Sequence, residues 1–195
     1  MNTGGKKLIL ASGSPRRKEL LEMLGFHDFD IVPARGEESV PEGLGPEKIV
    51  KALSRAKAAE VSASCGEGAL VLAADTIVWV DGRMLGKPHS EQDAFDMLKL
   101  LSGRSHEVYT GLTLIDGDGE LSGCERCRVH FRPLTETEIL RYIQDGEPMD
   151  KAGAYGAQGK GALFVRAIEG DFFNVMGLPV CLLGQMLARK GVTVL

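Results

Sequence analysis

Near its amino terminus the chain reads LILASGSPRR, which covers residues 8–17. Its first four residues form a short, bounded apolar run of the kind that makes a buried strand. Ser14 is a favourable helix N-cap and Pro15 suits the first helical position, so the sequence predicts a strand followed directly by a helix. Two serines, a glycine and two arginines gather at that helix start. Because helix N-termini and guanidinium groups bind phosphate oxygens, this turn predicts a phosphate site and favours a nucleotide as the ligand.

The bulk composition narrows the class of protein. The chain has 195 residues, 44% of them hydrophobic, and a formal net charge of −4. That length can bury one substantial core, or two small lobes that share a sheet, and we expect a single domain over residues 1–195. A general nucleic-acid-binding protein would carry a basic surface, which the acidic balance argues against. No apolar run reaches the ~20 residues of a membrane helix, and the start of the chain lacks a signal peptide's apolar core, so we expect a cytoplasmic protein.

Hydrophobic periodicity and turn residues predict an alternating series of strands and helices. We expect strands at residues 7–11, 30–33, 70–74, 107–115, 124–132 and 163–168. The third of these is expected to end at Asp75-Thr76, and residues 77–80 are expected to continue it up to the turn at Asp81-Gly82. We expect helices at residues 15–24, 46–64, 90–101, 135–145 and 179–190. The glycine-rich residues 146–161 predict a loop. The order of these elements indicates an α/β fold with a mixed, elongated sheet flanked by helices.

Local patterns predict a helix face, helix caps and a hairpin turn among these elements. Ile49, Leu53 and Ala56 are expected to mark the inner face of the helix over 46–64. Thr135 with Glu138 is predicted to cap the helix over 135–145, and Ser90 with Asp93 to form a capping-box variant at the start of the helix over 90–101. The pair Asp81-Gly82 is a strong hairpin-turn signal.

Asp75 follows a run of apolar residues and is expected at the carboxyl end of a buried strand. Open α/β sheets bind their ligands at such strand ends. Burial of a carboxylate is costly unless a positive charge accompanies it. Asp75 is therefore either a turn cap or partner of Lys87, or a general base or metal ligand beside phosphates.

Charged residues elsewhere suit a polyphosphate and a cation. Glu38 lies in a loop and is either a solvated charge or a second carboxylate for a divalent cation, which takes one or two protein carboxylates when it binds with a triphosphate. Lys57 shares its helix with three other basic residues, and spacing does not choose among them. Lys87 precedes Pro88, which favours an extended backbone in a loop that can return to the strand ends.

Residues 153–161 are rich in glycine, but the spacing and the lack of Ser or Thr after Lys160 exclude a P-loop. Gln158 can hydrogen-bond the edge of a base both as donor and as acceptor. Cys124 and Cys127 form a C-x-x-C pair without the second pair that a zinc site usually needs. We interpret the cysteines as structural thiols and leave a metal or redox role for this pair open. The four histidines lack metal-ligand spacing and are interpreted as surface or packing residues.

Six ordered stretches together resemble the Maf family of nucleoside triphosphate pyrophosphatases. They span nearly the whole chain and cover residues 8–17, 55–58, 73–76, 86–88, 146–161 and 174–179. The resemblance implies a fold like that of Maf proteins and inosine triphosphatases, with a central cleft between two lobes. It also implies hydrolysis between the α- and β-phosphates, giving a nucleoside monophosphate and pyrophosphate, with a divalent cation (Mg²⁺ or Mn²⁺) as cofactor.

The resemblance carries over to particular positions of this sequence. It implies that Asp75 accepts a proton and binds the metal together with Glu38. Positions associated with base choice are occupied by Arg16, Thr76 and Gln158. This combination is similar to the branch of the family that acts on dTTP and UTP. The other substrate-binding positions fall on Ser12, Lys57 and Lys87.

One departure concerns the acidic loop, where the family commonly has Asp-Glu-Ser and this chain has Glu37-Glu38-Ser39. Arg17 is expected to be a surface charge. Two alternatives for the function stay open here. One is pyrophosphate release from a modified or non-standard purine nucleotide; the other is a nucleotide-binding regulator of cell division or septum formation. Exposed edges of the long hairpins would suit a homodimer.

Overall fold

The computed structural model describes residues 4–36, 40, 43–66 and 68–194. The chain divides into two compact units. Unit 1 comprises residues 1–75, 110–125 and 177–195, and unit 2 comprises residues 76–109 and 126–176. The single domain predicted from the sequence stays a prediction.

Within the described residues the strands form one seven-stranded sheet in the order β2-β1-β3-β5-β6-β7, with β4 paired to β3. Their bounds are β1 Lys7–Leu10, β2 Phe29–Ile31, β3 Ala69–Val80, β4 Arg83–Leu85, β5 Ser105–Asp116, β6 Gly119–Phe131 and β7 Val165–Glu169. β1 runs parallel to β2 and β3, whereas β4 and β7 run antiparallel to β3 and β6. The helices are α1 Pro15–Met23, α2 Pro46–Ala63, α3 Glu91–Leu101, α4 Glu136–Gln144, α5 Phe172–Val175 and α6 Val180–Arg189. The predicted mixed α/β sheet flanked by helices is confirmed.

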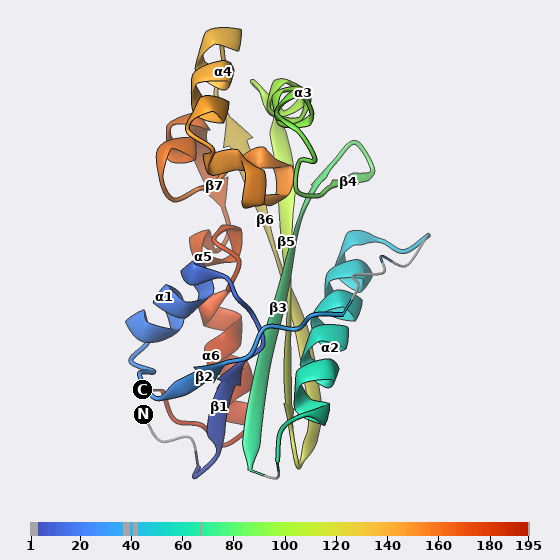
Figure 1. Ribbon diagram of the computed structural model, residues 1–195, viewed down its shortest axis with the longest axis vertical. Coiled ribbons are helices and arrows are strands. Elements are labelled where there is room, and N and C mark those ends of the chain that lie inside the picture. The colour runs from blue at the N-terminus through green and yellow to red at the C-terminus, as the bar shows by residue number, and fades with distance from the viewer. Residues whose placement is uncertain (1–3, 37–39, 41–42, 67, 195) are drawn as a thin grey trace. The chain divides into compact units, whose positions relative to one another are not determined.

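In unit 1 the helices α2 and α6 lie on opposite sides of the strands (Figure 1). α2 packs its Ala58 and Val61 against Val71 and Ala73 of β3. Ala56, predicted on the inner face, is exposed. At 100° per residue the buried stripe of α2 instead follows Val50, Ser54 and Val61, and Ala56 falls beside it.

A glycine lets α2 approach β5 closely. A Cβ atom on Gly111 would lie 2.3 Å from the carbonyl oxygen of Val50. Next to this contact, the hydroxyls of Ser54 and Thr113 are hydrogen-bonded at 2.9 Å. Because only glycine leaves room for the helix backbone there, this position fixes the depth at which α2 packs on the sheet.

A buried carboxylate at the end of β5 links this strand to the residue before β1 and to the end of α6 in unit 1. Asp116, at the end of β5, accepts hydrogen bonds from Lys6 at 2.8 Å and from Lys190 at 2.6 Å. Burial opposes its ionisation, but the hydrogen bonds from Lys190 and Lys6 lower the pKa of Asp116 below its ordinary value. The pair of lysines therefore compensates a charge that could not be buried alone.

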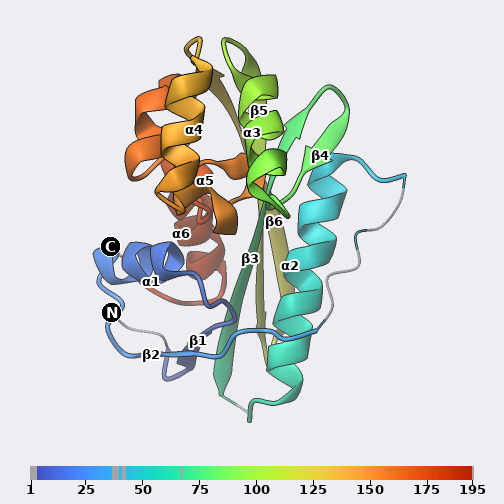
Figure 2. The same cartoon turned by 45° about the horizontal axis from the view of Figure 1, so that its top comes forward.

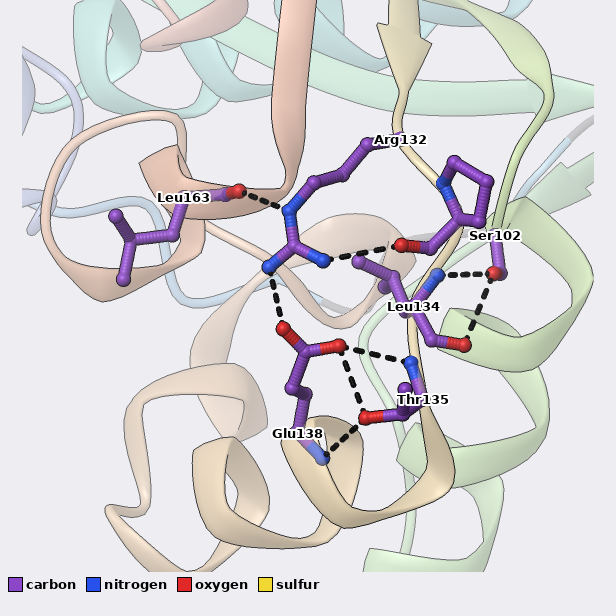
Figure 3. A network of polar contacts seen from close by, with 7 residues as sticks. Ser102, Arg132, Leu134, Thr135, Glu138 and Leu163 are labelled. Atoms are coloured by element: carbon purple, nitrogen blue, oxygen red, sulfur yellow. Dashed lines mark hydrogen bonds and ion pairs between the residues drawn. The ribbon is translucent and has the colours of Figure 1, made fainter.

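Unit 2 has its own core of buried apolar side chains from β3, β5, β6, α3 and α4. The helices α3 and α4 lie side by side in both views (Figure 2). Thr135 and Glu138 cap the start of α4, as predicted, and form a capping box. Arg132 donates to Glu138 at 2.7 Å and to the carbonyl of Leu163 at 2.8 Å, so it joins the end of β6 to α4 and to the 3-10 helix over residues 160–164 (Figure 3).

Several element boundaries differ from the prediction. β6 begins at Gly119 rather than at residue 124, because the hairpin with β5 continues through a polar, glycine-containing stretch that lacks an apolar pattern. Residues 160–164 form a 3-10 helix, and β7 starts only at Val165. The loop over 146–161 contains two further 3-10 turns, and the four-residue helix α5 was not predicted.

Candidate active site

The first part of the candidate site lies where β1 ends, next to the middle of the long strand β3. The sequence analysis expected Asp75 at the carboxyl end of its strand, but β3 continues through Asp75 to Val80 because residues 78–80 pair with β4. Leu10 of β1 pairs with Leu72 of β3 in parallel register. Ser12 lies two residues beyond the first position and Asp75 three beyond the second. The two residues therefore follow the paired register of β1 and β3 on neighbouring segments of the chain.

Asp75 is 6% exposed and forms an ion pair with Lys57 of α2. Strand side chains alternate, so Asp75 lies on the same face of β3 as Val71 and Ala73, the face that α2 covers. The sequence analysis had considered a lysine partner for Asp75 as one of two alternatives, with Lys87 in that role; the structure places Lys57 there. The ammonium of Lys57 compensates the buried charge and offsets the free-energy cost of removing the carboxylate from water.

A positional signal for Lys57 was present in the sequence. Seven residues separate Lys57 from Val50, so the helix period places it on the buried stripe of α2 beside Ser54 and Val61. Lys48 lies off that stripe and is exposed. A lysine in the middle of an apolar stripe needs an acid opposite it, and β3 supplies Asp75.

The turn between β1 and α1 is held by Arg17, which the sequence analysis had assigned to the surface. Its guanidinium donates to Ser12 Oγ at 2.9 Å and to the carbonyl of Gly177 at 2.8 Å. Ser12 Oγ also accepts from the backbone N–H of Ser14 at 3.3 Å. Ser14 is the N-cap and Pro15 the first helical residue, as predicted, although the Ser14 side chain makes no capping hydrogen bond. Ser12 is thus buried and fixed by two donors.

Arg16 lies in the first turn of α1 and is half-buried. The first N–H groups of a helix have no acceptor within the helix, and they carry a positive partial charge. Arg16 therefore adds a full charge to a turn that already favours anions. Thr76 follows Asp75 directly and, by strand alternation, lies on the opposite face of β3.

Unit 2 contains the remaining predicted substrate residues. Lys87 is exposed in the loop after β4. The preceding residue, Gly86, accepts a hydrogen bond at 2.9 Å from the N–H of Gly153 in the glycine-rich loop. Gln158 is exposed further along the same loop. The backbone contact therefore joins the loop of Lys87 to the loop of Gln158 within this unit.

Glu38, predicted as a metal ligand, lies outside the described residues. Among the residues that the structure describes, no three His, Cys, Asp or Glu side chains gather as a metal cluster. Mg²⁺ takes one or two protein carboxylates and completes its shell with water and phosphate oxygens. Asp75 supplies an oxygen donor of the required kind.

The cysteines and histidines take no part in this arrangement. Cys124 and Cys127 are three residues apart on β6, so their side chains point to opposite faces, and neither forms a disulfide. Burial raises the pKa of Cys124 to about 12. His106 is buried with its Nε2 2.7 Å from the hydroxyl of Tyr155. His130 pairs with Glu169 at 2.7 Å. These are packing and surface contacts, as predicted.

The fold and the candidate site define an α/β protein in which the strand leading into the turn of Ser12 pairs with a strand that carries a buried carboxylate. Two solved structures resemble its fold. The Ham1 protein of Staphylococcus aureus has a TM-score of 0.50 and 16% identity, and the match covers 95% of this chain and 100% of that one. A HAM1 protein from Coxiella burnetii has a TM-score of 0.50 and 18% identity, with 94% and 99% covered.

Sequence comparison identifies the family. The family model described as Maf-like protein matches residues 7–190, and the chain belongs to this family. A relative from Carboxydothermus hydrogenoformans, named dTTP/UTP pyrophosphatase, is 52% identical over 95% of this chain and 99% of its own length. A relative of the same name from Bacillus cereus is 49% identical over 97% of this chain and 92% of its own. The resemblance stated from the motifs is confirmed.

Proposed function

We propose that this chain hydrolyses dTTP and UTP between the α- and β-phosphates and releases the nucleoside monophosphate and pyrophosphate. The support from comparison is membership in the Maf family and two relatives at about half identity that carry the name of this activity. The observation that supports the chemistry is the buried carboxylate of Asp75, ion-paired with Lys57, on the strand next to the one that leads into the turn of Ser12 and Arg16.

Each residue has a role that follows from its chemistry. Asp75 is the proposed general base, which orients and deprotonates the water that attacks the α-phosphorus. A carboxylate held by Lys57 and buried in the sheet keeps a fixed direction, and this lowers the cost of aligning the water. Arg16 and the α1 N-terminus bind phosphate oxygens, where fixed positive charge stabilises the transition state.

The remaining roles concern substrate binding. We propose that Lys87 neutralises phosphate charge and that Gln158 hydrogen-bonds the edge of the pyrimidine, with Thr76 and Arg16 contributing to base choice. Ser12 holds the turn in place together with Arg17. None of these roles requires a P-loop, because the N-terminus of α1 presents the backbone donors instead.

We propose a divalent cation, Mg²⁺ or Mn²⁺, held by Asp75 and by Glu38, the latter outside the described residues. When bound, such an ion neutralises phosphate charge and polarises the phosphoryl oxygens. The Asp75 carboxylate would then have three partners, the cation, the attacking water and Lys57, which engages its Oδ1.

A substrate screen tests the proposal. The purified chain is incubated with dTTP, UTP, dCTP, dGTP and inosine triphosphate, each with Mg²⁺ and with Mn²⁺, and pyrophosphate and inorganic phosphate are measured separately. We expect pyrophosphate from dTTP and UTP. A preference for the purine nucleotides, or release of single phosphates, would contradict the proposal.

Location and assembly are also proposals. Among the described residues, no helix is both long and apolar enough to cross a membrane. We propose a cytoplasmic enzyme, and a homodimer through the exposed strand edges stays a prediction that light scattering can test.

A further inference from the structure

The glycine-rich segment over residues 156–161 is held at both ends by two side chains from outside it. Tyr142 lies in the last turn of α4, and Glu147 follows five residues later. Between them Gly146 has a φ of 74°, a left-handed conformation that ends the helix and turns the chain back. The Tyr142 hydroxyl thereby donates a hydrogen bond to Glu147 Oε1 at 3.0 Å.

The same two side chains bind the backbone of the segment. At its start, the N–H of Gly156 donates to the Tyr142 hydroxyl at 3.1 Å. At its end, the N–H of Lys160 donates to Glu147 Oε2 at 3.0 Å, and the N–H of Gly161 donates to Glu147 Oε1 at 3.3 Å. One continuous set of hydrogen bonds therefore joins the two ends of the segment.

The packing leaves this backbone little freedom. A Cβ atom on Gly161 would lie 2.4 Å from the carbonyl oxygen of Gly156 and 2.7 Å from the Tyr142 hydroxyl. Tyr142 is 4% exposed, and burial raises its pKa, which keeps the hydroxyl protonated and able to donate to Glu147. The side chain of Gln158, in the middle of the segment, is exposed. A fixed backbone thus presents one exposed amide.

We propose that Glu147 and Tyr142 are positioning residues that fix the position of Gln158 and so determine how well the protein discriminates between bases. This inference rests on the proposed function, in which Gln158 contacts the pyrimidine. A carboxylate is suited to the task because its oxygens only accept hydrogen bonds, and three donors converge on them. A fixed segment leaves room for a pyrimidine, whereas a loosened one admits the larger purine.

The test compares Glu147→Gln and Tyr142→Phe with Thr135→Ala. Glutamine places an amide N–H₂ against a backbone N–H, and phenylalanine removes the hydroxyl that joins the two ends. Thr135→Ala weakens the cap at the opposite end of the same helix α4 and leaves the segment untouched. For each variant kcat and KM are measured with dTTP and with dGTP, together with the midpoint of urea unfolding.

Misplacement of a binding group by ~1 Å can cost about 10²-fold in rate. We expect the ratio of kcat/KM for dTTP to that for dGTP to fall about tenfold or more in Glu147→Gln and in Tyr142→Phe, mainly through an increase in KM for dTTP. Thr135→Ala should leave this ratio within about twofold of the wild-type value, even if its urea-unfolding midpoint falls as far as the midpoints of the other two variants. Equal ratios in all three variants and the wild type would overturn the proposal.

A double-mutant cycle tests whether the two residues act through Gln158. In a Gln158→Ala background, Glu147→Gln should change the dTTP-to-dGTP ratio by less than about twofold, because the group it positions is gone. A further tenfold loss in that background would contradict the proposed route.

Two readouts separate this inference from the proposed function. Amide hydrogen exchange of Lys160 and Gly161 should quicken in Glu147→Gln and not in Thr135→Ala. Binding of dTTP and dGTP analogues with a methylene bridge between the α- and β-phosphates reports base discrimination without turnover. If the wild type discriminates in binding but releases no pyrophosphate, the proposed function fails and the inference stands. If Glu147→Gln leaves both exchange and binding unchanged, the inference fails alone.

Discussion

His106 couples the stability of unit 2 to pH. Its side chain is buried, with the ring edge-to-face against Phe131 at 5.0 Å and Tyr155 at 5.3 Å. Nε2 has the hydroxyl of Tyr155 as its partner, whereas Nδ1 has no hydrogen-bond partner within the described part of the chain. Protonation would bury a charge and an N–H without an acceptor. Burial, with a smaller contribution from His130, accordingly lowers the pKa of His106 from 6.5 to about 4.

The sign of the effect follows from the two protonation states. Between pH 6.5 and about 4 the unfolded chain binds a proton at His106 that the folded chain does not. The stabilisation is therefore fully present above pH 6.5 and is lost as the pH falls towards 4. Each pKa unit corresponds to about 1.4 kcal/mol, so the whole loss is about 3 kcal/mol, most of it reached by pH ~4.5.

The assay is urea unfolding at four pH values from 7.5 to 4.5 for the wild type and for His106→Gln. Glutamine does not titrate, and the other ionisable groups contribute to both proteins, so the difference between the two pH profiles isolates His106. We expect the wild type to lose about 2 to 3 kcal/mol more than the variant over this range. Parallel profiles would refute the reasoning, because His106 would then titrate in the folded state as it does in the unfolded chain.

Three further outcomes follow from the packing and the site. Asp116→Ala should cost about 3 kcal/mol in urea unfolding because it leaves two lysines without their buried partner, whereas exposed Asp118→Ala should cost under about 0.5 kcal/mol. Gly111→Ala should cost about 3 kcal/mol because its Cβ would overlap the backbone of Val50, while Gly117→Ala, with open space, should be nearly neutral; calorimetry compares them. Chelation of divalent cations should abolish pyrophosphate release from dTTP without lowering the unfolding midpoint, and added Mg²⁺ or Mn²⁺ should restore it.

Local signals predicted the elements whose causes are local. Ser14 and Pro15 marked the start of α1, and Thr135 with Glu138 marked the start of α4, because caps act within one helical turn. Element ends that depend on distant partners were missed. The first residues of β6 carry no apolar alternation, and they become a strand because β5 lies opposite them in the hairpin.

In the candidate site, too, local signals could be predicted from the sequence and contacts with distant residues could not. The burial of Asp75 could be predicted because an apolar run before a carboxylate is visible in sequence, but its place inside a strand that continues to Val80 could not. Its partner Lys57 required a comparison of helix phase with strand phase, since three other basic residues share α2. Glu147 carries no sequence signal of its own. Its role arises from hydrogen bonds to backbone N–H groups 13 and 14 residues away, which a loop prediction for the segment does not contain.

The most direct test of the central claim is the turnover of dTTP by Asp75→Asn. Asparagine keeps the size of the side chain but can neither accept the proton nor compensate Lys57. We expect kcat for pyrophosphate release to fall at least about 10²-fold in a folded protein. Asp81→Asn, on the exposed hairpin turn, serves as the matched control and should keep wild-type turnover. Near-normal turnover by folded Asp75→Asn would contradict the account and remove the buried carboxylate from the chemistry.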